Sequence, residues 1–259
     1  MSQIDVESNK GTEFQSQCEA AGAANTDNRY MPTPKNDFID YLIDHSANGC
    51  LDVVINCAKD GHDHWRSLFV RGFANVIEEN SRLRTRFYKH LCIDEVQPHS
   101  GPIFQSFLEN LTEENRQQFF STSALKDKNH PANHVFSRAA FKTPSGTLAF
   151  DLLKSFISTG LCDAALNELS LRRHLDVKMA CTTGNHDFLN LLFQHLRPAP
   201  SKLLVHVVEN PKNGPVLVAK LIQNGTVPLQ TFKNRELLIA ADEHVILVIS
   251  GLEARQTRV

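Results

Sequence analysis

Two C-terminal stretches decide the fold: LLVHVVENPKNGPVLVAKLIQNGT at residues 203–226 and ELLIAADEHVILVISG at residues 236–251. Each holds an apolar segment, a turn and a second apolar segment that ends at or just before a glycine. Leu204 and Leu237 occupy matching places, at an offset of 33 residues. LLVHVV and VILVIS are β-prone in isolation, but an offset of this size is typical of helix pairs in a repeat. We therefore predict helices in both stretches.

The same order of features recurs upstream in three further stretches. They are DHSANGCLDVVINCAKDG at residues 44–61, SRAAFKTPSGTLAFDLLKSFISTG at residues 137–160 and VKMACTTGNHDFLNLLFQHL at residues 177–196. This pattern resembles the ankyrin repeat, which has a small-residue first helix, a glycine-centred turn and an aliphatic second helix. Small residues let neighbouring helices approach, and the glycine permits the left-handed backbone that ends a helix.

The resemblance implies an all-α fold: an ankyrin-like helical-repeat solenoid, or an irregular helical bundle, with a disordered N-terminal tail. No stretch carries the TPLH tetrapeptide of the family, and the upstream spacing exceeds 33 residues. Another α-solenoid and a mixed α/β fold therefore stay open as alternatives. Besides the shorter helices that follow, we predict one long helix over Trp65–Leu91.

The chain divides by composition into three regions. Residues 1–35 are polar, and the first leucine of the chain is Leu42. Such a segment buries too little apolar surface to offset its ordering entropy, so we predict a disordered tail and linker that is dispensable for folding. We assign residues 36–130 to an N-terminal helical region and residues 131–259 to degenerate ankyrin-like repeats.

Composition and charge exclude several classes of protein. The 259 residues include 27 Lys and Arg against 29 Asp and Glu, a net charge of −2, so we do not expect nucleic acid as a partner. No apolar run approaches the ~20 residues of a membrane span, and the N-terminus lacks a signal peptide. Six scattered cysteines then indicate free thiols in a reducing compartment, and we expect a cytoplasmic protein.

The resemblance implies a non-enzymatic scaffold for protein–protein interaction, because stacked repeats present their turns and first helices to a partner. Degenerate ankyrin-like repeats in a chain of this size are similar to host-directed effectors of intracellular bacteria, which act in the host cytoplasm after secretion. The turn residues are the candidate binding residues: Asn185, His186, Asn213 and His244. We expect a protein partner and no cofactor.

An enzyme on a helical scaffold is the first alternative. Cys181 is its candidate nucleophile, with His186 and Asp187 beside it in a turn, because a thiol needs a nearby base for activation. Cys181 also fits a small-residue position of the repeat, which explains it without catalysis. The chain has no GxSxG, HExxH, GxxxxGK[ST] or GxGxxG motif in a suitable context.

Three weaker signals concern a metal, a charged ligand and a peptide-binding domain. Cys57, His62 and His64 are zinc-type ligands, but their spacing matches no known metal module. A basic cluster within residues 81–91 could bind nucleic acid or anionic lipid, although a solvated helix face explains it equally. Its members are Arg82, Arg84, Arg86 and Lys89. Thr257 and Val259 resemble the carboxyl-terminal ligand of a PDZ domain.

Overall fold

The structure is a computed structural model that describes residues 74–93, 96, 98 and 100–256. Contacts divide the chain into Met1–Trp65 and Arg66–Val259, and the described residues all belong to the second unit. The predicted tail, the metal candidates Cys57, His62 and His64, and the PDZ-type residues Thr257 and Val259 lie outside the described residues. Those described form helices and no strand, which confirms the all-α prediction.

The helices are mostly short and follow one another closely. Their bounds are α5 Ala74–Glu79, α6 Ser81–Tyr88, π-helix η2 Lys89–Ile93, α7 Ser100–Glu109, α8 Glu113–Phe119, α9 Thr122–Leu125, α10 Pro131–Ala139, α11 Pro144–Thr159, α12 Asp163–Arg172, α13 His174–Thr183, α14 His186–His195, α15 Ser201–Val208, α16 Gly214–Gln223, α17 Leu229–Phe232, α18 Arg235–Ala240 and α19 Glu243–Gln256. LLVHVV falls in α15 and VILVIS in α19, so both β-prone segments are helical, as predicted.

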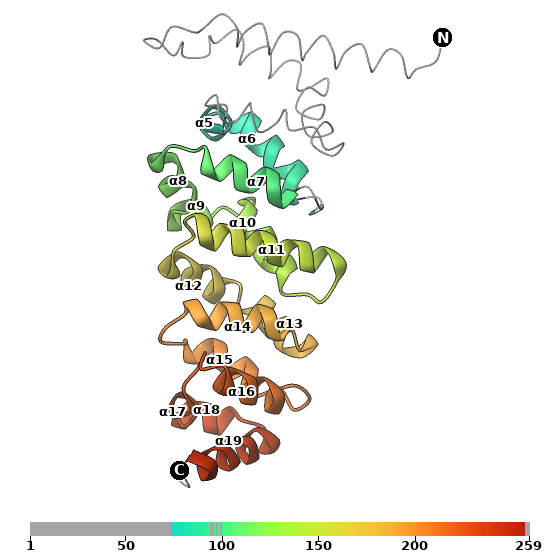
Figure 1. The fold of residues 1–259 in the computed structure, drawn as a ribbon, viewed down its shortest axis with the longest axis vertical. Helices are drawn as coiled ribbons and strands as arrows, with labels where there is room; N and C mark the ends of the chain where they lie inside the picture. Colours follow the sequence, from blue (N-terminus) through green and yellow to red (C-terminus); the bar gives the residue numbers. More distant parts are fainter. Residues whose placement is uncertain (1–73, 94–95, 97, 99, 257–259) are drawn as a thin grey trace, which may run out of the picture. The chain divides into compact units, whose positions relative to one another are not determined.

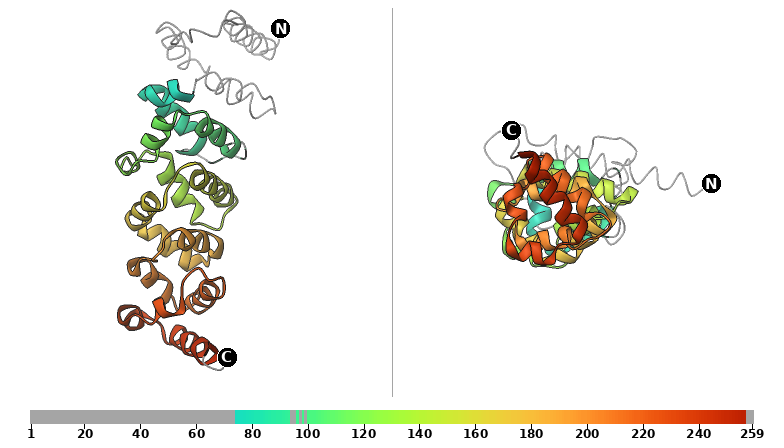
Figure 2. Two further views of the ribbon diagram at one scale, coloured as in Figure 1. Left: turned by 60° about the vertical axis from the view of Figure 1, so that its left-hand side comes forward. Right: turned by 90° about the horizontal axis from the view of Figure 1, so that it is seen from below.

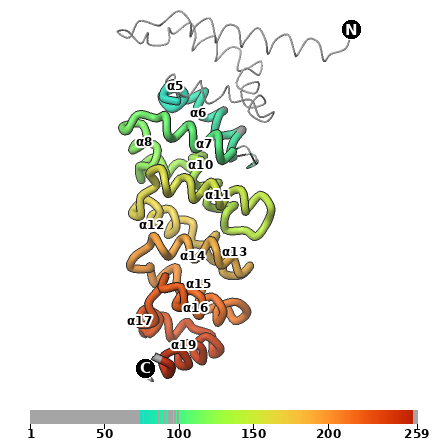
Figure 3. Tube along the Cα trace, in the orientation of Figure 1, coloured from blue at the N-terminus to red at the C-terminus, as the bar shows by residue number. Residues whose placement is uncertain are grey.

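The helices pack as pairs in chain order, as Figures 1 and 3 show for this unit. The first helix of each C-terminal pair packs against the next one, from α13 to α15 and from α15 to α18. The second helices do the same, from α14 to α16 and from α16 to α19. We call α10, α13, α15 and α18 the first helices, and α11, α14, α16 and α19 the second helices (Figure 2).

Packing continues across residue 130. The first helix α10 contacts η2, and the second helix α11 contacts α7. The core at this end is aromatic, with ring centroids 4.8 Å apart for Phe87 and Phe107 and 5.4 Å apart for Phe104 and Phe156. The predicted regions on either side of residue 130 therefore share a packed core.

The C-terminal core is aliphatic and contains the pair that defined the 33-residue offset. Leu204 on α15 and Leu237 on α18 are both fully buried. Val208 is also fully buried, whereas its predicted equivalent Ala241 is only half-buried. Ala241 lies just beyond the end of α18, because this first helix is shorter than α15.

The single long helix predicted over Trp65–Leu91 is wrong where the structure describes it. The chain breaks at Asn80, between α5 and α6. The Asn80 Oδ1 atom accepts hydrogen bonds from the backbone N–H groups of Arg82 (3.1 Å) and Leu83 (3.2 Å). An asparagine in this place satisfies amides that a new helix leaves free, so it begins α6 and does not continue α5.

Candidate functional site

The turns inside the helix pairs carry polar groups that bond to the preceding pair. Asn185 Nδ2 donates to the carbonyl oxygens of Ala139 (2.9 Å) and Ala140 (3.2 Å) at the end of α10. Asn213 Nδ2 donates in the same way to Cys181 and Thr182, at 3.2 and 2.7 Å. These amides satisfy carbonyl groups that a helix end leaves without an intrahelical partner. The two predicted binding residues thus connect neighbouring pairs.

The next turn repeats this contact with a backbone group. The N–H of Asp242 donates to the carbonyl oxygen of Val208 at 2.9 Å, so α15 is joined to the turn before α19. The candidate binding residue His244 is exposed in the same turn, and its Nδ1 lies 3.0 Å from Asp242 Oδ1. One interaction therefore recurs at three successive junctions, which is the behaviour expected of a repeat.

His186 begins α14 beside a cavity of about 320 Å³ that also touches Asp187, Asn190 and Lys220. The ring is half-buried, and its Nδ1 has no hydrogen-bond partner within the described residues. Burial, followed by the charges of Lys220 and Lys142, lowers the pKa of His186. A neutral imidazole is consistent with this surrounding positive charge.

The environment of Cys181 does not favour nucleophilic catalysis. Its side chain is fully buried on α13, in the small-residue position that the repeat predicts. Burial, more than the nearby charge of Glu209, raises the pKa of the Cys181 thiol to about 12. A thiol with this pKa stays protonated at neutral pH, whereas catalytic cysteines are accessible and have lowered pKa values. The predicted group of Cys181, His186 and Asp187 thus lacks an activated nucleophile.

The basic cluster of residues 81–91 is divided by the fold. Arg82 and Lys89 are exposed, but Arg84 turns toward α5. Its Nη1 donates to the backbone oxygen of Glu78 at 2.9 Å and lies 3.5 Å from the Glu78 carboxylate. The side chain of Arg86 lies outside the described part of the chain. Because Arg84 is neutralised by Glu78, the exposed positive charge is smaller than the sequence indicated.

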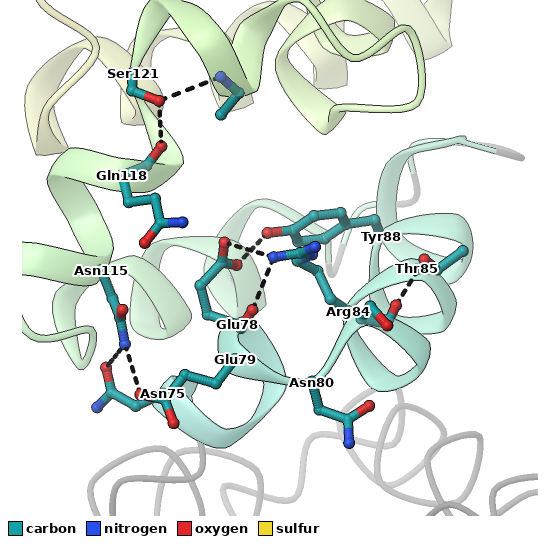
Figure 4. A network of polar contacts seen from close by, with 12 residues as sticks. Asn75, Glu78, Glu79, Asn80, Arg84, Thr85, Tyr88, Asn115, Gln118 and Ser121 are labelled. Atoms are coloured by element: carbon teal, nitrogen blue, oxygen red, sulfur yellow. Dashed lines mark hydrogen bonds and ion pairs between the residues drawn. The ribbon is translucent and has the colours of Figure 1, made fainter.

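A polar group that sequence reasoning missed lies between α5 and α6 (Figure 4). Glu78 is only 7% exposed, and the hydroxyl of the buried Tyr88 donates to its carboxylate. Burial raises the pKa of Glu78, and the Tyr88 hydrogen bond and the Arg84 charge oppose this rise. Burial, together with the Glu78 charge, also raises the pKa of Tyr88. Perturbed groups of this kind are common at binding sites.

His130 lies on the other side of the same region. It is 6% exposed, and its Nδ1 accepts a hydrogen bond from the backbone N–H of Ala132 at the start of α10 (3.2 Å). Burial lowers the pKa of His130 to about 4, although the Phe119 carbonyl favours the protonated ring. That carbonyl does not satisfy Nε2 in hydrogen-bonding geometry, and Nε2 has no other partner within the described residues. The neutral ring therefore carries its proton on Nε2.

The largest exposed apolar side chains of the first helices are on α13 and α18. Leu175 is 66% exposed on α13, where Met179 follows it by one turn, and Ile239 is 76% exposed on α18 next to Leu238. An i,i+4 pair such as Leu175 and Met179 lies on one face of a helix. We call the exposed side of α13, α15 and α18 the first-helix face.

Polar contacts join α13 to α15 on this face. His174 stacks on His206, and Lys178 forms an ion pair of 3.5 Å with Glu209. His174, Lys178, His206 and Glu209 thus fix which residues of the two helices stand side by side. The first-helix face combines apolar side chains with both signs of charge.

Comparisons with protein-family models, curated proteins and solved structures found no match. The helices described by the structure include none with both the length and the apolar character of a membrane span. The same part of the chain contains no group of three or more His, Cys, Asp or Glu side chains arranged to hold a metal ion. The geometry of the chain itself therefore carries any functional proposal.

Proposed function

We propose that this chain is a non-enzymatic scaffold that binds a partner protein through its first-helix face. The supporting observation is the exposure of Leu175, Met179 and Ile239 on helices that pack in succession. A helix of a folded protein usually turns its large apolar residues inward, and exposed apolar clusters often mark interaction sites.

The composition of the face suits a protein partner. Apolar anchors at the centre of an interface supply most of its affinity, and polar or charged groups form its rim. Leu175 and Met179 have the character of such anchors, and Lys178 and Glu209 of such a rim. Turn and first-helix residues are also the surface that the ankyrin resemblance implies. Action inside a host cell stays a prediction of that resemblance.

The two alternative functions receive less support. An enzyme built on Cys181 would need an accessible thiolate, but this thiol is buried and protonated. A nucleic-acid or lipid module would need the charge of Arg84, which Glu78 neutralises.

The proposal is tested by capture with matched surface variants. The full chain and the double variant Leu175→Glu/Met179→Glu are used as baits in parallel, and bound proteins are quantified by mass spectrometry. Truncation of an interface anchor costs about 2 kcal/mol or more, so the double variant should retain its partners at least tenfold less well. The fold should be unaffected because both side chains are already in contact with water.

The control is Val216→Glu/Leu247→Glu, which places the same charges on exposed apolar positions of the second helices α16 and α19. Partners that the control retains and the first-helix variant loses support the proposal. A set of partners that both variants retain equally would contradict it, as would the absence of any reproducible partner.

A further inference from the structure

The Glu78 and His130 groups border one cavity of about 300 Å³. Its walls come from α6, from α8 and α9, and from the loop before α10. This volume is at the lower end of the usual range for ligand pockets and corresponds to about ten water molecules. We call it the Glu78–His130 cavity. It suits a compact ligand of about a dozen heavy atoms.

The cavity presents hydrogen-bonding groups that the protein does not use. The His130 Nε2–H has no partner, although this residue is more than nine-tenths buried. Gln118 and Asn129 also line the cavity, and no hydrogen bond from another described residue occupies their side-chain amides. Each amide can donate and accept. An unsatisfied buried donor is costly, so a ligand or water oxygen at His130 would relieve that cost.

The charges around the cavity favour an uncharged ligand. Arg84 is held by Glu78, so the two largest buried charges neutralise each other. The remaining charge is that of Asp127, whose carboxylate would repel a phosphate or carboxylate ligand. The apolar lining is limited to Ala124 and the ring of Tyr88, which is too little for a lipid or drug-like molecule.

A molecule with several hydroxyl groups meets all these conditions, because each hydroxyl both donates and accepts. We propose that the Glu78–His130 cavity binds a small uncharged polyhydroxylated molecule of the size of a monosaccharide or cyclitol. His130 and Gln118 would donate to its oxygens, and Asp127 would accept from its hydroxyl protons. This site is separate from the first-helix face, so the two proposals stand independently.

The test is ligand-observed saturation-transfer NMR on the full chain, followed by titration. The probes are D-glucose, D-galactose, D-mannose and myo-inositol, with inorganic phosphate as a charged comparison. We expect at least one neutral probe to bind saturably, with a Kd on the order of 1 mM, and phosphate to bind more weakly.

Two exposed positions provide variants that should leave the fold intact. Gln118→Ala and Asn129→Ala each remove an amide from the cavity, and each should weaken binding about three- to tenfold. Gln117→Ala is the matched control, since Gln117 is exposed on the same helix but bonds to Glu113. His130→Asn keeps an acceptor for the start of α10 and removes the Nε2 donor, so it should also weaken binding.

Three results would overturn the proposal. One is no saturable binding of any neutral probe at about fifty times the expected Kd. Another is binding that Gln118→Ala and Asn129→Ala leave as strong as Gln117→Ala does, which would place the site elsewhere. The third is a phosphate affinity above that of all neutral probes, which would contradict the inferred ligand class.

Discussion

The imidazole rings of His174 and His206 stack across the junction of α13 and α15, with centroids 5.6 Å apart and an interplanar angle of 15°. The Nδ1 of His174 lies 3.4 Å from the Nε2 of His206, and the Nδ1 of His206 lies 3.0 Å from Glu209 Oε1. Because Lys178 also contacts Glu209, four side chains tie the two first helices together on the face proposed to bind a partner.

His206→Ala should destabilise the fold by about 1 kcal/mol. It removes a ring contact and a hydrogen bond from the junction, and interactions of each kind contribute about 0.5–1.5 kcal/mol. Urea unfolding measures the change. Lys202→Ala is the control, because Lys202 is exposed on the same helix. Equal midpoints for the two variants would show that the His174–His206 contact does not support the junction.

Leu237→Ala should cost about 2–4 kcal/mol, because it removes a fully buried side chain from α18 and leaves part of a cavity. The loss should be local, since a terminal unit has a neighbour on one side only. Hydrogen exchange should show reduced protection over residues 236–251 and unchanged protection in α5 to α7. Leu247→Ala, at an exposed position of α19, provides the comparison. Uniform loss of protection would indicate one cooperative core instead of stacked units.

Gly214→Ala should destabilise the fold by about 1–3 kcal/mol. An added Cβ would stand 2.6 Å from the backbone oxygen of Val207 and 3.0 Å from Val245 Cγ2. The first of these is a backbone atom, so α15 and α16 would have to separate. In Gly251→Ala the new Cβ meets nothing within 4 Å, and this variant should be neutral or stabilising by up to about 1 kcal/mol. Thermal or urea unfolding distinguishes them, and equal effects would show that the close approach is unimportant.

His130 should make stability depend on pH. Its pKa is about 4 in the folded protein and 6.5 in the unfolded chain, so the unfolded chain binds more protons between these values. Stability is then fully present above about pH 6.5 and falls as the pH is lowered toward 4, by as much as about 3 kcal/mol. Urea unfolding between pH 7 and pH 4 should show this slope in the natural protein and a smaller one in His130→Asn. The same slope in both proteins would contradict the prediction; His244→Asn, at an exposed ring, is the control.

The sequence by itself determined the helical class and most helix positions. Repeated apolar spacing, closing glycines and the 33-residue offset were enough to predict helices for the β-prone segments 203–208 and 245–250, because these signals act within one or two turns of chain. The burial of Leu204 and Leu237 followed from the same pattern. Asn80 is an exception, since its capping hydrogen bonds interrupt a helix that periodicity alone would continue.

Only the tertiary structure decided which residues are available for function. Leu175 and Met179 have the spacing of a buried stripe, yet they are exposed because the faces of α13 that pack on neighbouring helices carry other residues. Glu78 and His130 lie on distant segments, and no local pattern indicates that both border one cavity. Burial, charge neutralisation and unsatisfied donors are properties of side chains that the fold brings together, so the sequence determined the helices and their packing determined the sites.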